Sequence, residues 1–196
     1  MKKERGLFIA IEGLDGSGKT ALANDLGAHF SCRLEFEPTN GKIGSLIRSA
    51  LQDLPYNTHA FALLFALDRE RHSKKIKKAL EYTNIICDRY LLSSLAYQGL
   101  EIPKEEILRI NSGILFPDIT IFLDAPPELC LERIEASGKK KDAFENLVFL
   151  KKLKNSYGSA INFAKERALF DTHIIDATKS IKDCRSETLK IIRSYF

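Results

Sequence analysis

The octapeptide Gly13-Leu14-Asp15-Gly16-Ser17-Gly18-Lys19-Thr20 fills every fixed position of the phosphate-binding pattern G-x-x-x-x-G-K-[ST]. An apolar run at Leu7–Glu12 precedes it, and a helical pattern follows from Ala21. Glycines let the backbone wrap around a phosphate, so that N–H groups and the helix N-terminus point at negative charge. We expect this loop to bind a nucleoside triphosphate rather than to be a mere glycine-rich turn. Lys19 would reach the β- and γ-phosphates, and the Thr20 hydroxyl would bind Mg²⁺.

Short apolar runs recur along the rest of the chain, with helical patterns between them. The later runs are Leu34–Glu37, Asn84–Asp88, Asp118–Leu123 and His173–Asp176. The helical patterns cover Ala21–Phe30, Ile43–Leu51, His59–Glu81, Leu129–Ser137 and Asp142–Arg167, and a last stripe runs from Ile181 to Tyr195. This alternation predicts an α/β fold, with a parallel sheet covered on both faces, in one domain over residues 1–196.

Composition narrows the class of protein further. Of the 196 residues, 44% are hydrophobic and 29% are charged, so the chain can bury a sizeable core. The four cysteines lie far apart, which argues against a metal knuckle and for reduced thiols. The apolar run Leu7–Ile11 is too short for a signal core or a membrane span. We therefore expect a soluble, cytoplasmic protein that has no membrane partner.

A second motif follows the predicted strand at Asn84–Asp88. Asp88-Arg89-Tyr90 would place an acid and a base at the carboxyl end of a buried strand, where open α/β sheets bind ligands. Asp88 fits a carboxylate that faces the water shell of magnesium, and Arg89 fits a clamp on an acceptor phosphate. A surface ion pair is the simpler alternative.

A third feature lies on the helix predicted over His59–Glu81. Phe65 and Arg69 are four residues apart, so they share one face, where a ring can stack on a base and a guanidinium can donate to it. Phe65 taken alone is more often a core residue at such spacing. The basic residues that follow fit a solvated face: Arg71, Lys74, Lys75, Lys77 and Lys78. No Asn-Lys-x-Asp motif is present, which disfavours a GTPase.

Together the motifs resemble those of the thymidylate kinase family. They are Gly13–Thr20, Glu37-Pro38-Thr39, Leu64–Arg69, Asp88-Arg89-Tyr90 with Ala96-Tyr97-Gln98-Gly99, Pro117-Asp118 and Ile175-Asp176-Ala177. They follow the family order and cover most of the chain. The resemblance implies a P-loop NTPase fold with a five-stranded parallel sheet, usually as a homodimer. It also implies transfer of the γ-phosphoryl group of ATP to dTMP with Mg²⁺.

The resemblance also implies roles for single residues. Phe65 resembles the ring that stacks on thymine, Arg69 the arginine that reads its carbonyl, and Arg89 the clamp on the acceptor phosphate. Tyr97 resembles the residue that crowds the sugar 2′ position, with Gln98 beside it. Asp15 resembles the loop carboxylate that meets the 3′-hydroxyl. Glu37 and Arg48 lie at the same ligand edge, with Arg48 toward the acceptor phosphate, and Arg133 is expected near the adenine.

The chain departs from the family in the lid, expected at about residues 135–150. Family members supply an arginine from the loop, where this chain has Gly16, or from a lid pattern Asp-Arg-x-Glu, where it reads Asp142-Ala143-Phe144-Glu145. Phosphoryl transfer needs a cation on the equatorial oxygens. Lys141, Lys139, Lys140 or Arg133 would have to supply it, although a lysine lacks the bidentate fork of arginine.

Three other functions stay open at this point. A deoxynucleoside kinase would use Glu37 as a base on a hydroxyl acceptor. A nucleotide-binding module without turnover would explain the missing arginine. Nucleic-acid binding is weaker, because no recognition motif or interleaved aromatic residues accompany the basic stretches.

Overall fold

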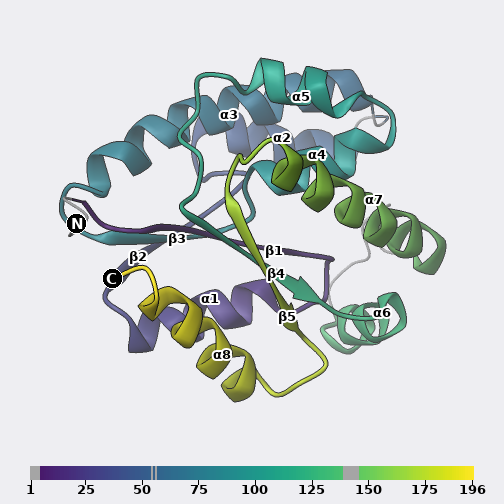
Figure 1. Ribbon diagram of the computed structural model, residues 1–196. Helices are drawn as coiled ribbons and strands as arrows, with labels where there is room; N and C mark the ends of the chain where they lie inside the picture. Colours follow the sequence, from purple (N-terminus) through teal and green to yellow (C-terminus); the bar gives the residue numbers. More distant parts are fainter. Residues whose placement is uncertain (1–4, 54, 56, 139–145) are drawn as a thin grey trace.

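A five-stranded parallel sheet forms the centre of the computed structural model, which describes residues 5–53, 55, 57–138 and 146–196 (Figure 1). The strand order is β2-β3-β1-β4-β5. The strands are β1 (Phe8–Gly13), β2 (Cys32–Phe36), β3 (Asn84–Asp88), β4 (Ile119–Asp124) and β5 (Asp171–Asp176). The predicted α/β class, the number of strands and their parallel direction are confirmed.

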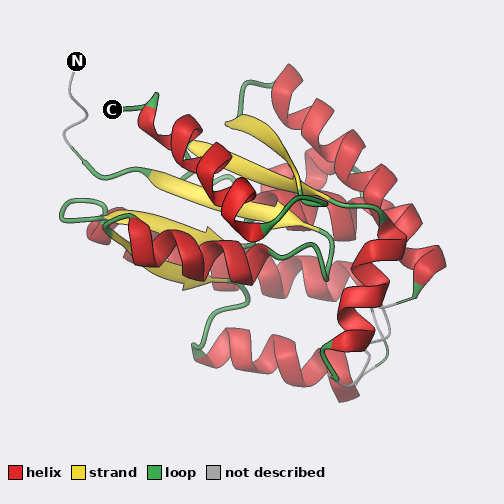
Figure 2. Cartoon of the chain, turned by 90° about the horizontal axis from the view of Figure 1, so that it is seen from below, coloured by secondary structure: helices red, strands yellow, loops and turns green. Residues whose placement is uncertain are grey.

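Helices cover both faces of this sheet. They are α1 (Lys19–His29), α2 (Lys42–Asp53), α3 (Thr58–Ala79), α4 (Leu91–Tyr97), the 3₁₀ turn η1 (Gln98–Leu100), α5 (Lys104–Ile110), α6 (Pro127–Ala136), α7 (Leu147–Glu166) and α8 (Ile181–Arg193). In Figure 1, α1 and α8 lie below the sheet and α2 to α5 with α7 lie above it. Figure 2 shows the molecule from below, with α8 lying across the lower face of the sheet. Within the described ranges, no helix is long and apolar enough to cross a membrane.

The central strand explains why one edge of the sheet carries the functional groups. Every residue of β1 is buried, because β3 and β4 flank it and helices cover both faces. Its register pairs Ile11 with Asp88 on β3 and Gly13 with Leu123 on β4. The ends of these parallel strands therefore meet, and the loop after β1 starts beside Asp88.

Several boundaries differ from the predicted ones. β2 begins at Cys32 and ends at Phe36, and the short elements α4, η1 and α5 were not predicted. Helix α4 follows β3 almost directly and is largely buried, so its apolar residues show no clear helical stripe. Helix α7 begins at Leu147, where the Asn146 side chain accepts a hydrogen bond from the Phe149 N–H. The predicted start at Asp142 falls outside the described residues.

The basic face of α3 is solvated, as expected. Arg71, Lys74, Lys75, Lys77 and Lys78 are all exposed. On the opposite side of the helix, Phe61 packs with Ile47 and Ala50 of α2, and Phe65 lies against this small cluster. Phe65 is thus a half-buried residue at the border between core and cavity.

Candidate active site

The glycine-rich loop joins β1 to α1 with a backbone that needs glycine. Gly13, Gly16 and Gly18 have φ values of 148°, 78° and 98°. A Cβ on Gly16 would lie 2.2 Å from the carbonyl oxygen of Cys130 on α6. This contact leaves no room for a side chain, so an arginine at position 16 would not fit the loop as it is packed here.

Lys19 lies at the start of α1 and folds back over the loop. Its Nζ donates to the Leu14 carbonyl at 2.6 Å and lies 3.8 Å from Asp15 Oδ1. Burial, and then the charge of Arg89, lower the pKa of Lys19 to about 8. Anionic phosphates bound in the loop would raise this pKa again, because they favour the charged amine.

Thr20 and Asp88 form a second polar pair beside the loop. The Thr20 hydroxyl donates to Asp88 Oδ2 at 2.5 Å. The other carboxylate oxygen, Oδ1, is buried and has no hydrogen-bond partner among the described residues. A buried carboxylate oxygen without a partner is costly, so it marks a place for a ligand.

Arg89 occupies the turn between β3 and α4 in a conformation rare for a non-glycine residue. Its φ is 68°, and its N–H donates to the Ile11 carbonyl at 2.9 Å. Its guanidinium pairs with Asp15 and donates to Ser93 Oγ at 3.1 Å. It also lies 3.4 Å from the Tyr157 and Tyr97 hydroxyl oxygens. Backbone strain of this kind is typical of functional sites.

Glu12 fixes that turn from the neighbouring strand, and sequence reasoning missed it. Its buried carboxylate accepts from the Tyr90 N–H at 2.8 Å, the Ser93 N–H at 3.1 Å and the Ser93 hydroxyl at 2.6 Å. It thereby caps α4 from outside the helix. The only signal in the sequence was an acid at the end of a fully apolar strand.

Asp15 lies between the loop and Arg89. Its Oδ2 accepts from the Tyr97 hydroxyl at 2.6 Å. Burial alone would raise the pKa of Asp15, but the charges of Arg89 and Lys19 outweigh it and hold the pKa well below its usual value. Burial raises the pKa of Tyr97 well above the ordinary value, so its hydroxyl is a neutral donor.

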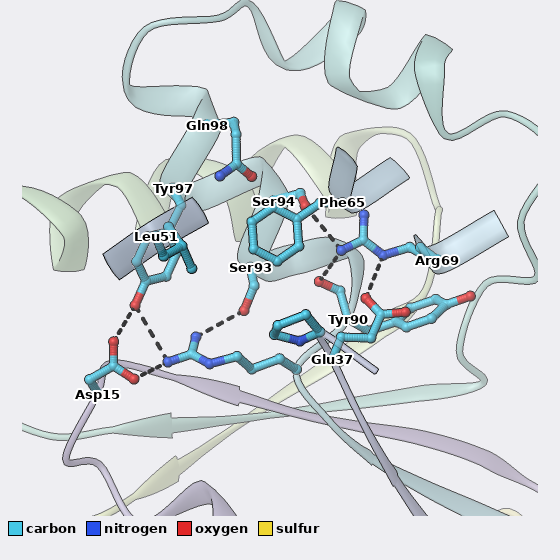
Figure 3. Close-up of a pocket in the computed structure, with 12 residues that line it drawn as sticks. Asp15, Glu37, Leu51, Phe65, Arg69, Tyr90, Ser93, Ser94, Tyr97 and Gln98 are labelled. Carbon is cyan, nitrogen blue, oxygen red and sulfur yellow. Dashed lines mark hydrogen bonds and ion pairs between the residues drawn. The ribbon is translucent and has the colours of Figure 1, made fainter. Parts of the chain in front are cut away.

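A cavity of about 190 Å³ opens beside this group (Figure 3). It is lined by Asp15, Glu37, Pro38, Leu51, Phe65, Arg69, Arg89, Tyr90, Ser93, Ser94, Tyr97 and Gln98. We call it the acceptor cavity. The structure thus brings together all the residues predicted for the second substrate except Arg48, which is not among its lining residues. The Arg48 guanidinium instead donates to the Pro38 and Thr39 carbonyls, at 2.7 and 2.8 Å.

A wider cavity of about 670 Å³ follows the loop. Its lining includes Gly16, Gly18, Lys19, Thr20, Asp88 and Arg133, and we call it the donor cavity. Asp15, Glu37 and Arg89 line both cavities. The two spaces therefore meet at the Asp15–Arg89 ion pair. Arg133 also donates to the Ala177 carbonyl at 3.1 Å, beside a further hollow of about 250 Å³ that Ser17 and Lys179 line.

Arg69 is held by four hydrogen bonds on the inner wall of the acceptor cavity, as Figure 3 shows in part. It donates to Glu37 Oε2 at 2.9 Å, Asn111 Oδ1 at 2.9 Å, Ser94 Oγ at 3.0 Å and the Tyr90 carbonyl at 3.2 Å. A guanidinium has five N–H donors, so these four bonds leave one N–H without an assigned partner among the described residues. The sequence patterns did not reveal Ser94 or Asn111 as partners.

Glu37 has both carboxylate oxygens occupied. Oε2 accepts from Arg69, and Oε1 lies 3.1 Å from His72 Nδ1. A carboxylate engaged in this way is poorly suited to take a proton from a substrate hydroxyl.

The lid is only partly described. Lys139, Lys140 and Lys141, with the Asp142–Glu145 pattern, lie outside the described residues. These lysines begin a lysine run over residues 139–154. Its last member, Lys154 on α7, lies at the carboxyl end of β4, with Nζ 3.0 Å from Asp124 Oδ1 and 3.3 Å from the Ala125 carbonyl oxygen.

Comparisons with known proteins show to which family the chain belongs. The family model described as thymidylate kinase matches residues 11–188. A relative from Methanococcus maripaludis strain C6, named "Probable thymidylate kinase", is 39% identical over 189 residues and covers 94% of each chain. One of the same name from Methanocaldococcus jannaschii is 36% identical over 191 residues and covers 96% of each. The solved structure of thymidylate kinase from Candida albicans superposes with a TM-score of 0.80 at 26% identity, covering 97% of this chain and 92% of that one. The chain belongs to the thymidylate kinase family.

Proposed function

We propose that the residues around the donor cavity and those around the acceptor cavity have separate roles in the reaction of this family. The chain is a dTMP kinase, which transfers the γ-phosphoryl group of ATP to dTMP and gives dTDP and ADP. The observation that carries the division of roles is the shared wall of the cavities, where Asp15 and Arg89 line both. Two anionic substrates bound in these spaces would face each other there, and catalysis would come from proximity and charge.

On the donor side, the glycine loop would hold the phosphates of ATP and Lys19 would contact the β- and γ-phosphates. Arg133 would lie near the adenine. Thr20 and Asp88 would hold Mg²⁺, since hydroxyl and carboxylate oxygens are the hard ligands that this ion prefers, and Asp88 Oδ1 has no hydrogen-bond partner in the described part of the chain. A bound Mg²⁺ would offset the negative charge of the phosphates.

On the acceptor side, Phe65 would stack on thymine and Arg69 would donate its remaining N–H to a thymine carbonyl. Arg89 would bind the acceptor phosphate, and Asp15 would accept from the 3′-hydroxyl. Tyr97 would fill the space of a 2′-hydroxyl, with Gln98 beside it. Arg48 would act indirectly, since it fixes the Pro38 turn that lines the cavity.

The transferring phosphoryl group would receive its cation from Lys141 in the lid, over about residues 135–150 of this single domain. No arginine fits at Gly16, because Cys130 packs against that glycine. Lys154 of the same lysine run lies at the edge of the sheet, beside Asp124. It therefore makes the natural comparison for a Lys141 variant.

A homodimer fits the outer surface of α2 and α3. Leu46 on α2 and Leu63 and Leu67 on α3 are 54%, 60% and 51% exposed. Leu63 and Leu67 are one helical turn apart, and α2 packs on α3, so a second copy could cover these leucines together. A cytoplasmic location fits the four free cysteines.

A coupled assay of ADP release with ATP, Mg²⁺ and a panel of acceptors tests the proposal. We expect turnover with dTMP and none with thymidine. Turnover with thymidine would favour the deoxynucleoside kinase, and tight binding of ATP and dTMP without ADP release would favour a non-catalytic module. Nothing in the comparisons favours either alternative.

A further inference from the structure

One buried histidine behind the acceptor cavity takes no part in the roles described above. His72 lies on α3, three residues after Arg69, and is 3% exposed. Its ring lies between the carboxylates of Glu35, on β2, and Glu37, directly after β2, with Nδ1 3.1 Å from Glu37 Oε1 and Nε2 3.2 Å from Glu35 Oε2. The side chains of Glu37 and Glu35 are 3% and 19% exposed, so water competes little for these contacts.

The chemistry of the ring decides its charge. A neutral imidazole carries hydrogen on only one nitrogen, so its other nitrogen would direct a lone pair at an ionised carboxylate. Both contacts are favourable only if both nitrogens carry hydrogen, which makes the ring a cation. Burial alone would lower the pKa of His72, but the hydrogen bonds and charges of Glu35 and Glu37 outweigh it and raise the pKa to about 9.

The position of Glu37 connects this ring to the substrate site. Glu37 Oε2 accepts from Arg69 Nε, and its Oε1 faces His72, so the carboxylate is held from both sides. Arg69 faces the acceptor cavity, and His72 lines a separate hollow on the outer side of α3. We propose that His72, as an imidazolium, is a positioning residue that holds the Glu37 carboxylate in place. Arg69, which donates to that carboxylate, is then already oriented for the base of dTMP when the substrate arrives.

Charged groups from every neighbouring element bear on this ring. Arg33 of β2 forms an ion pair with Glu35 at 2.6 Å, so it competes with His72 for that carboxylate. In the outer hollow, Lys42 of α2 and Asp68, Arg71 and Lys75 of α3 lie with His72. Asp68 is engaged by the N–H and hydroxyl of Thr39, at 2.7 Å each. From β3, the Cys87 thiol faces the glutamates, and burial followed by the charge of Glu37 raises its pKa well above the usual value. The two glutamates are the groups bonded to the ring.

Nitrogen-15 NMR of histidine-labelled protein reads the protonation state directly. We expect both His72 ring nitrogens to show the imidazolium shift at pH 7.5, with the signals assigned by their loss in His72→Gln. A single neutral tautomer at that pH would overturn the proposal. Glu35→Gln should lower the pH at which the ring loses its proton, because an amide can accept from or donate to the second nitrogen.

Steady-state kinetics then test positioning. We expect His72→Gln to raise the KM for dTMP about tenfold, with kcat and the KM for ATP within about twofold, because one hydrogen bond to a buried carboxylate is lost. His59→Gln, an exposed histidine on the same helix, is the matched control and should change neither constant. In the unmodified chain the KM for dTMP should rise at alkaline pH, and Glu35→Gln should move this rise to lower pH. An unchanged KM in His72→Gln, or a pH profile that Glu35→Gln does not shift, would refute the role.

The inference rests on the proposed placement of dTMP in the acceptor cavity, and Phe65→Ala separates the two. If Phe65→Ala raises the KM for dTMP and His72→Gln does not, only the role of His72 is wrong. If neither variant changes it, dTMP binds elsewhere. Should His72→Gln fail to fold, Glu35→Gln still gives both the NMR and the kinetic result.

Discussion

The acceptor cavity and the donor cavity share a wall, but their cations are held very differently. Arg69 and Arg89 each have four partners, which come from three segments of the chain in each case. On the donor side, Lys19 donates to a carbonyl of its own loop, and Asp88 Oδ1 has no partner among the described residues. Fixed donors lower the cost of binding one particular ligand. The acceptor side is therefore built for discrimination, and the donor side for binding charge.

Arg89 gives the strongest test of this contrast, because it belongs to both cavities. Replacing it with lysine keeps the positive charge but loses the planar guanidinium, which contacts Asp15 and the Ser93 hydroxyl at the same time. We expect Arg89→Lys to lower kcat/KM for dTMP by about a thousandfold or more, as for the loss of a bidentate group in a buried site. Steady-state assays at varied dTMP measure this effect.

The control for that variant is a surface arginine outside both cavities. Arg193, in the last turn of α8, is exposed, and Arg193→Lys should leave kcat/KM unchanged. A drop of less than tenfold in Arg89→Lys would mean that charge alone suffices at Arg89, and that the contrast between the cavities is wrong.

The stability of the acceptor wall should depend on pH through His72. Its pKa in the folded protein is about 9, above the ordinary value of 6.5, so the folded state binds the proton more tightly. The stabilisation is fully present below about pH 6.5 and is lost as the pH rises through about 9. It amounts to at most about 3 kcal/mol in the free energy of unfolding.

Denaturant titrations from pH 6 to 10 measure this contribution as the difference between the unmodified chain and His72→Gln. We expect the difference to be largest near pH 6 and to shrink toward pH 10. Other groups that titrate in this range are common to both proteins and cancel. A difference that is constant with pH would show that His72 acts by packing alone.

The sequence was sufficient for those parts of the site that depend on local patterns. The motif at Gly13–Thr20 predicted a glycine-rich loop between a strand and a helix. The parallel order of strands predicted that Asp88 and Arg89 would lie at the same edge of the sheet as this loop. Phe65 and Arg69 were found from their spacing on one helix and do line the cavity. Each of these signals lies within a few residues of chain.

The contacts that fix these residues carry no such local signal. Glu12 binds Tyr90 and Ser93 about eighty residues away, and Arg69 binds Asn111 and Glu37 from two other segments. Such pairs arise only when the sheet brings the segments together. Helix α4, which carries much of the cavity wall, was missed because its buried residues lack a polar face. The sequence could therefore predict which groups line the two cavities, but not what holds them in place.

Tyr97 tests the contrast between the two cavities on a single group of the acceptor, the sugar 2′-hydroxyl. Its ring lines the acceptor cavity, and its hydroxyl is bonded to Asp15, so the ring cannot turn away easily. We expect kcat/KM for the ribose form of TMP to lie about a hundredfold below that for dTMP, because a 2′-hydroxyl would overlap the ring. Tyr97→Phe should keep most of this ratio, because the ring remains although its hydrogen bond to Asp15 is lost. Equal values for the two sugars in the unmodified chain would remove this role from Tyr97, and dUMP in the same panel reports on the base separately.

The smallest effect is expected on the donor side, where the proposed cation, Lys141, lies outside the described residues. Lys141→Ala should lower kcat by about tenfold or less and change the KM for ATP and dTMP much less, because the charge would act on the transferring group only in the transition state. Lys154→Ala is the matched variant from the same lysine run, since Lys154 already has Asp124 and the Ala125 carbonyl as partners. A loss of kcat in Lys154→Ala but not in Lys141→Ala would move the cation from the lid to α7. The donor side would then hold a positioned charge like those of the acceptor cavity, and the contrast between the two regions would be weaker than the ground-state contacts indicate.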